Sequence, residues 1–151
     1  LLLATPDAIA KPSPELQLQV PQNNDRVEAL AISPDGKLVA AVDELHGLLV
    51  VVARRRSTVS YSTAASSMAT ISLPPDSSAF HHMLGDVSAR ALDDGAPLLS
   101  AVVVHKHDGK PGGGFARLGR RLGFEVAEDD VAEDVFWGQQ LSAVHDWWSR
   151  R

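Results

Sequence analysis

The chain has 151 residues, of which 44% are hydrophobic and 22% charged, and its formal net charge is −5. This length and apolar fraction are those of one ordinary domain or two small ones, and they exclude a chain that is disordered throughout. The sequence contains no cysteine, which excludes disulfides, zinc–thiolate sites and thiol catalysis. No apolar run approaches the roughly 20 residues that span a bilayer, so we expect a cytoplasmic protein with no membrane partner.

Residues 1–25 are predicted to be an extended arm because four prolines punctuate them. The first ten residues contain no methionine, and Asp7 interrupts their apolar run. We therefore expect a trimmed or fragmentary start rather than the end of a signal peptide.

Residues 26–79 are predicted to form an antiparallel β-meander. Two apolar runs, 38–42 and 48–53, have the length and the branched side chains of strands. The tight turn at 33–36 precedes them, with Pro34 fixing φ and Gly36 accepting a positive φ. Residues 43–47 are expected to turn the chain between the two runs, and residues 68–73 to add one more strand.

Residues 80–151 have a different pattern, which predicts a helix–strand–loop–helix–helix unit. Apolar residues at helical spacing predict a first helix over 80–91 that Gly95 stops, and residues 98–105 have the pattern of a buried strand. A Gly-rich loop follows, then a short helix over 115–122 ended by Gly123, and a last helix from about 131 to 148. The fold class predicted for the whole chain is α+β.

Two segments resemble known families. Residues 24–59 contain SPDG, then VDE, then a small-residue turn and LLV, and they resemble a WD-repeat blade of the periodic tryptophan protein family of ribosome-assembly propellers. A second SPDG-like segment follows, and its Asp76 lies 41 residues after Asp35. This distance is within the period of about 40–45 residues that propeller blades have. This resemblance implies strands over residues 24–59 and, as a function, a scaffold for assembly.

The second resemblance covers residues 80–148. The strand PLLSAVVV and the turn GKPGGGF, followed by a short helix and an aromatic C-terminal helix, are similar to an uncharacterised family of small bacterial proteins. This resemblance implies a fold rather than an activity.

A local basic patch surrounds the Gly-rich loop of this otherwise acidic chain. Glycine lets backbone N–H groups approach an anion closely, and such a loop leading into a helix is a common way to hold phosphate. The segment fits neither the P-loop nor the dinucleotide fingerprint, and a plain surface turn is the competing interpretation. The candidate partner- or anion-binding residues are Lys106, Lys110, Gly112, Gly113, Gly114, Arg117, Arg120 and Arg121.

A metal site is the main alternative in this region. In a strand, His105 and His107 lie on the same side, and Asp108 adds an oxygen ligand, so the three are a candidate metal set. Spacing specifies no further ligand. A polar strand end at the surface is the competing interpretation.

The last helix contains both acidic and aromatic residues. The acidic run 125–134 is expected to cap the start of the helix, because carboxylates complement the helix dipole there. Trp148 lies on the apolar stripe, whereas Trp137 and Trp147 lie off it and are candidates for a partner surface. Core packing of these two tryptophans is the competing interpretation.

These patterns predict a non-enzymatic module that binds a macromolecular partner through the basic Gly-rich loop and the aromatic C-terminal helix. A protein partner is expected first, nucleic acid stays open through the basic loop, and no cofactor is expected. The module is expected to be a monomer or homodimer. The alternatives are a small metal-dependent or nucleic-acid-processing enzyme and a propeller fragment.

Overall fold

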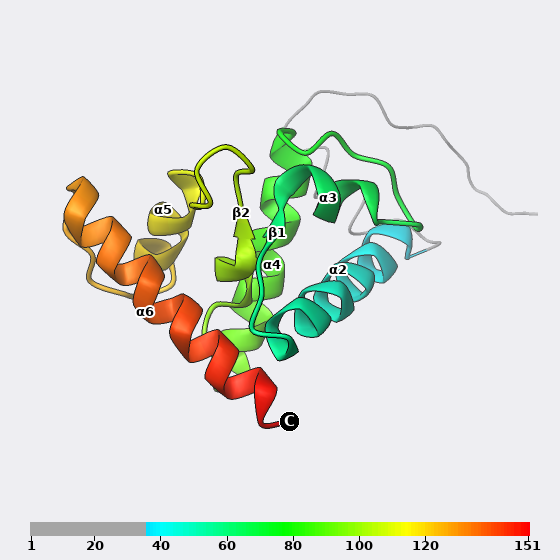
Figure 1. The fold of residues 1–151 in the computed structure, drawn as a ribbon. Helices are drawn as coiled ribbons and strands as arrows, with labels where there is room; N and C mark the ends of the chain where they lie inside the picture. Colours follow the sequence, from blue (N-terminus) through cyan, green and yellow to red (C-terminus); the bar gives the residue numbers. More distant parts are fainter. Residues whose placement is uncertain (1–35) are drawn as a thin grey trace, which may run out of the picture.

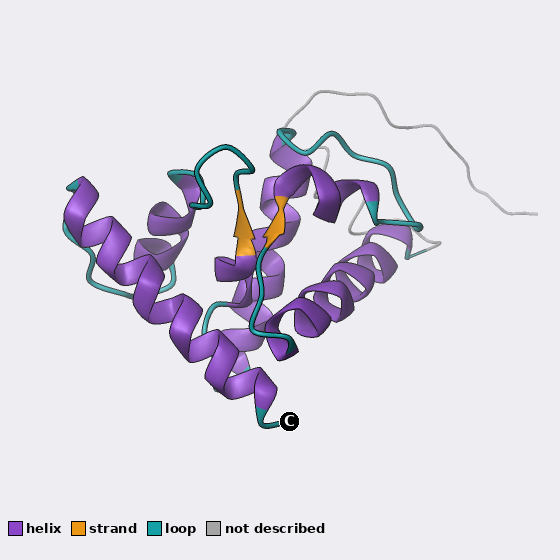
Figure 2. Cartoon of the chain, viewed as in Figure 1, coloured by secondary structure: helices purple, strands orange, loops and turns teal. Residues whose placement is uncertain are grey.

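The computed structural model of the chain describes residues 36–151, and these are mostly helical (Figures 1 and 2). The predicted arm over 1–25 and the part of the predicted meander before residue 36 lie outside the described residues. The three longest helices are α2 (Lys37–Arg54), α4 (Ser78–Asp93) and α6 (Asp130–Ser149). The shorter elements are β1 (Val59–Ser60), α3 (Tyr61–Ser66), the 3-10 helix η2 (Leu99–Val102), β2 (Val103–Val104) and α5 (Gly114–Arg121).

The predicted β-meander is wrong, because its two apolar runs and the turn between them form the single helix α2. Leu38, Ala41, Leu45 and Leu49 recur every three or four residues and are all buried, so they make one apolar stripe. Short apolar runs alone do not distinguish a strand from a buried helix. Here the helical spacing of the buried stripe is what favours a helix. The strands that the propeller resemblance implies are therefore absent from residues 37–54. Gly36 has the predicted positive φ, of 65°, directly before this helix.

The residues expected to turn the meander have other roles. Asp43 pairs with Arg90 of α4. Both carboxylate oxygens of Glu44 accept backbone hydrogen bonds, from Ala69 at 2.8 Å and Thr70 at 3.0 Å. The segment 68–73, expected as a strand, is instead an irregular connection that Glu44 ties to α2.

The centre of the molecule is the segment 98–104, in which every residue is buried. We expected one strand here. It is instead mainly the 3-10 helix η2, with the two-residue strand β2 pairing in parallel with β1. Ser100 explains part of the difference, because its backbone N–H donates to the Ser88 hydroxyl of α4 at 2.9 Å rather than to a neighbouring strand. Figure 1 shows α2, α4 and α6 around this centre, and the largest buried side chains include Phe80, Leu45, Met83 and Leu98.

The helices predicted after residue 80 are confirmed. Ser77 caps α4 by accepting from the Phe80 N–H at 3.2 Å, and Gly95 follows the helix with a φ of 82°. Gly123, with a φ of 104°, follows α5 in the same way. Asp129 caps α6 by accepting from the Ala132 N–H at 2.8 Å, so the capping role predicted for the acidic run is confirmed at this position. None of the helices in residues 36–151 is both long and apolar enough to cross a membrane.

Candidate functional site

The Gly-rich loop between β2 and α5 is a folded turn. The backbone N–H of His105 donates to the Lys110 carbonyl at 2.8 Å, and that of Gly109 donates to the His105 carbonyl at 2.9 Å. The Asp108 carboxylate accepts from the Lys110 N–H at 2.9 Å, and Gly109 has a φ of 69°, which favours glycine. These bonds fix where the following glycines lie.

Gly112 brings the loop against side chains from two distant parts of the chain. Its N–H donates to the Tyr61 hydroxyl of α3 at 3.0 Å. A Cβ atom at this position would lie 3.1 Å from Nε2 of His105 and 3.6 Å from the Tyr61 hydroxyl. A side chain here would therefore press on the His105 ring, and α3, β2 and the loop meet at one point.

A row of aromatic rings passes through this meeting point. The Tyr61 ring stacks on His81 of α4, with centroids 5.2 Å apart and an interplanar angle of 17°. Tyr61 also lies 4.7 Å from the His105 ring, and His105 lies 5.3 Å from His107. Burial raises the pKa of the Tyr61 hydroxyl and lowers the pKa of His81, so both groups favour their neutral forms. We call these four residues the ring row.

A cleft of about 740 Å³ lies beside the ring row, between α4 and α5. From α4 its lining includes His81, His82 and Gly85, and from α5 it includes Arg117 and Arg121. A Cβ on Gly85 would lie 3.4 Å from an Arg121 guanidinium nitrogen, so this glycine lets the arginine lie close to α4. A smaller cavity of about 320 Å³ adjoins it, and Tyr61, Asp76 and His81 line both.

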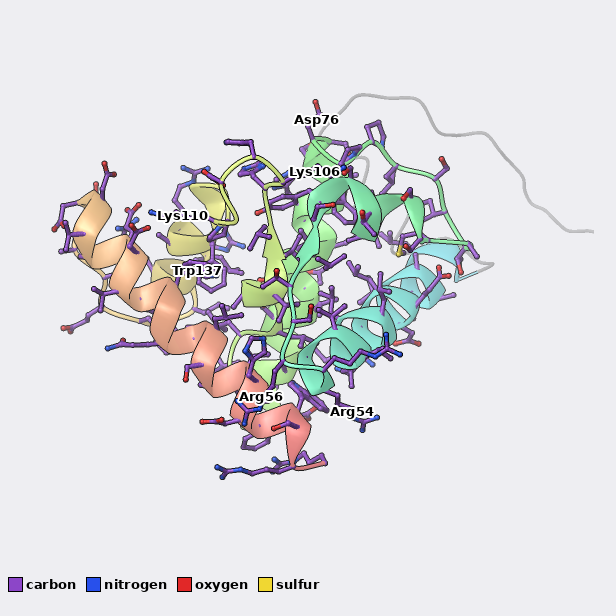
Figure 3. The ribbon with its side chains drawn as sticks, in the orientation of Figure 1. Arg54, Arg56, Asp76, Lys106, Lys110 and Trp137 are labelled. Atoms are coloured by element: carbon purple, nitrogen blue, oxygen red, sulfur yellow. The ribbon has the colours of Figure 1, made fainter. Side chains whose placement is uncertain are left out.

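The structure divides the predicted basic residues into two groups. Lys110 pairs with Asp134 of α6 at 2.8 Å, and Arg120 pairs with Glu133 of α6 at 2.6 Å. Arg120 also donates to the carbonyls of Val126 and Ala127. Within residues 36–151, Lys106, Arg117 and Arg121 have no carboxylate within ion-pair distance. Figure 3 shows Lys110 beside α5 and α6, and Lys106 near Asp76 at the other end of the loop.

The glycines are divided in a similar way. Gly112 faces Tyr61 and His105, whereas Gly113 and Gly114 lie next to the Arg117 guanidinium, whose nitrogens are 3.7 and 3.8 Å from where their Cβ atoms would be. Gly113 precedes α5, and no side chain caps this helix start. The guanidinium of Arg117 and the uncapped first turn of α5 therefore lie at the same mouth of the cleft.

The predicted metal set is only partly assembled. His105 and His107 are neighbours, and His107 lies 3.4 Å from the Asp108 carboxylate. However, nowhere in the described part of the chain do three or more His, Asp or Glu side chains form a group that could hold a metal ion. The metal site stays a prediction from spacing.

The tryptophans of α6 are half-buried and packed against the core. The indole N–H of Trp137 donates to the Ala101 carbonyl at 2.9 Å, and Figure 3 shows this residue between α6 and the centre of the fold. The Arg151 guanidinium lies 3.6 Å from the Trp147 ring centroid. The large apolar side chains of α6 that are exposed are Val131 and Val135, whereas Trp137 and Trp147 are partly exposed. A partner surface at these two tryptophans stays a prediction.

Sequence reasoning missed Tyr61, Asp76 and His81 as members of this site. The rest of α3, all of α4 and the 3-10 helix η2 lie between Tyr61 and His105 in the sequence, and no spacing pattern connects the two residues. The one available signal was the glycine run itself, because consecutive glycines indicate that some other group approaches the backbone closely.

Comparison of the chain with protein-family models, with curated proteins and with solved structures finds no match.

Proposed function

We propose that this protein is a non-enzymatic cytoplasmic module that binds an anionic macromolecule, and specifically nucleic acid, in the cleft between α4 and α5. The observation that carries the proposal is that Arg117 and Arg121 both line the cleft and that no carboxylate of residues 36–151 lies within ion-pair distance of either, although Asp76 and Asp86 also line the cleft. Unpaired guanidinium groups in a concave site bind phosphate oxygens well, because their planar donors match phosphate geometry.

The spacing of the two arginines supports a chain of phosphates rather than a single anion. Residues four apart on a helix lie on the same face, about one turn from each other. Arg117 is beside the loop glycines, and Arg121 is beside Gly85 of α4, so the two guanidinium groups lie at separate places along the cleft. Lys106 adds a third unpaired cation at the adjoining cavity.

The charge of the rest of the chain supports a restricted contact. The net charge of −5 means that the chain as a whole does not attract a polyanion, so binding depends on a local group of cations. A contact with few phosphates makes the affinity depend only weakly on salt. Each neutralised phosphate contributes about one unit to the slope of log affinity against log salt concentration.

The experiment that tests this proposal is fluorescence anisotropy with labelled DNA and RNA strands, at about 50 mM salt and again at about 200 mM. We expect the double variant R117A/R121A to bind roughly tenfold more weakly or worse than wild type. The matched control is R54A/R55A, which removes the same charge from exposed positions at the end of α2, far along the chain from the cleft. It should change the affinity by less than about twofold.

Three outcomes would overturn the proposal. The first is that wild-type protein binds neither strand at the lower salt. The second is that both double variants lose affinity equally. The third is that poly-L-glutamate competes as well as nucleic acid for the cleft, which would instead identify an acidic protein segment as the partner.

A further inference from the structure

The ring row reaches the cleft where the unpaired arginines are. His81 is exposed, lines both the cleft and the smaller cavity, and is held parallel to Tyr61 by stacking. Gly112 donates to the Tyr61 hydroxyl from the other side, so Tyr61 is fixed by contacts from two elements. A flat ring surface with a fixed orientation therefore borders a site suited to phosphate.

The smaller cavity has the composition of a pocket for a planar polar ring. Its lining includes the rings of Tyr61, His81 and His105, and the polar groups of Asp76 and Lys106. Figure 3 shows Asp76 and Lys106 at the same end of the molecule. A carboxylate accepts from the amino and imino groups of a base, and an ammonium group donates to its carbonyl oxygens and ring nitrogens.

We propose that an unpaired base of a single nucleic-acid strand stacks in this pocket on the ring row while Arg117 and Arg121 hold the neighbouring phosphates. This inference rests on the proposed function and specifies it: the cleft selects single strands over duplexes. In a duplex the faces of the bases are covered by their neighbours, whereas an unpaired base presents a face that any aromatic ring can stack on.

Stacking on rings and phosphate binding by arginines are the two contacts that single-strand sites combine. Here they come from different elements, the rings from α3, α4 and the start of the loop, and the arginines from α5. The cavity volumes of about 320 and 740 Å³ are within the usual range for sites that enclose a small ligand. The contact is therefore expected to involve a few nucleotides rather than a long track.

The test compares three probes on wild-type protein: a single strand, a duplex of the same length, and an abasic strand that keeps every phosphate but has no bases. We expect the base-bearing strand to bind roughly tenfold more tightly than the abasic strand, which is the scale of one to two stacked bases. The duplex should resemble the abasic strand. This comparison needs no variant, so it does not depend on a substituted protein folding.

Two variants then assign the effect to the ring row. H81A should remove most of the preference for bases, measured as the ratio of the affinities for the base-bearing and the abasic strand. H81F keeps a flat ring and removes the imidazole, so it should retain the preference, and the two variants together separate stacking from charge.

The results distinguish this inference from the proposed function. If the abasic strand binds as tightly as the base-bearing strand and R117A/R121A weakens both, the base pocket is refuted and the phosphate site stands. If H81F loses the preference as fully as H81A, stacking is refuted. If none of the three probes binds, the proposed function fails, and the base pocket fails with it.

Discussion

The two faces of α5 use arginine in opposite ways. On the side of α6, Arg120 is half-buried, pairs with Glu133 and donates to two backbone carbonyls of the connection between the helices. On the side of α4, Arg117 and Arg121 are exposed and line the cleft without a carboxylate partner among residues 36–151. The same side-chain type, within one short helix, holds the fold on one face and stays available on the other.

The difference shows how to separate structural from functional cations in this protein. A basic cluster in the sequence counts charges, but the number that matters for binding is the number left unpaired after folding. Of the five cations in the segment 106–121, the acidic start of α6 pairs with two, Lys110 and Arg120. The other three, Lys106, Arg117 and Arg121, have no carboxylate of residues 36–151 within ion-pair distance.

The strongest test of the paired face is Gly119→Ala in the α5–α6 interface. The new Cβ would lie 2.6 Å from two ring carbons of Phe136, and that ring is held between Phe115 and Phe124. Because the ring has little room to move, we expect a loss of about 2 kcal/mol in the free energy of unfolding. Urea unfolding followed by tryptophan fluorescence measures it.

Gly138→Ala in α6 is the matched control. No atom lies within 4 Å of the position of its Cβ, and the residue is an exposed position within a long helix. Alanine is the better helix former there, so this variant should be more stable than wild type by up to about 1 kcal/mol. A loss of stability in both variants, or in neither, would contradict the close packing of α5 on α6.

The contrast between the arginines predicts opposite results for two single substitutions. Arg120→Ala removes three hydrogen bonds at a half-buried position, so we expect the free energy of unfolding to fall by about 1–2 kcal/mol. Arg117→Ala should leave the thermal midpoint unchanged and weaken binding of a single strand. The contrast between the two arginines would be contradicted if Arg117→Ala lowered the free energy of unfolding and Arg120→Ala left it unchanged.

The helices of the second half were predictable because their ends have local signals. Ser77 and Asp129 cap α4 and α6 by side-chain hydrogen bonds within three residues, and Gly95 and Gly123 follow helices with positive φ. Each of these signals acts within one turn of helix. Local chemistry of this kind is visible in a single sequence.

α2 and the cleft were not predictable for the opposite reason. The apolar runs of α2 fit a strand or a helix equally well, and packing against α4, η2 and α6 makes the choice. In the cleft, Tyr61, His81 and Gly112 meet only because α3, α4 and the loop converge. The glycine run indicated that something approaches the loop, but no residue pattern indicated what does.

The pH dependence of binding provides a smaller test of the unpaired face. Burial, above all, lowers the pKa of His81, with neighbouring His105 acting in the same direction and the Pro75 backbone and Asp76 opposing. A phosphate bound nearby would favour the imidazolium, so binding takes up a proton and the affinity should rise as the pH falls from about 7.5 to 5.5, by roughly threefold. H81F should flatten this part of the profile.

Stability has the opposite pH dependence, which sets a control for that measurement. Because the pKa of His81 is lower in the folded chain than in the unfolded chain, unfolding takes up a proton, and stability falls as the pH drops below the ordinary histidine value. Burial also lowers the pKa of His46, so this histidine contributes to the same loss of stability at low pH. Thermal unfolding at each pH therefore accompanies the titration, and an affinity that falls with acidification while the protein stays folded would contradict the prediction.

Lys110→Ala is expected to have the smallest effect, and it tests the division of cations most directly. The hydrogen bond from Lys110 to Asp134 raises the pKa of this lysine, but both side chains are about half-exposed, and exposed ion pairs contribute little to stability. Since Lys110 is already paired and faces α6, its loss should change neither the thermal midpoint nor the affinity for a single strand measurably. Lys106→Ala, which removes the same charge from the unpaired group of the same loop, should weaken binding. If instead Lys110→Ala weakens binding as much as Lys106→Ala does, the lysine must leave Asp134 to reach the ligand, and pairing in the free protein would not decide which cations bind.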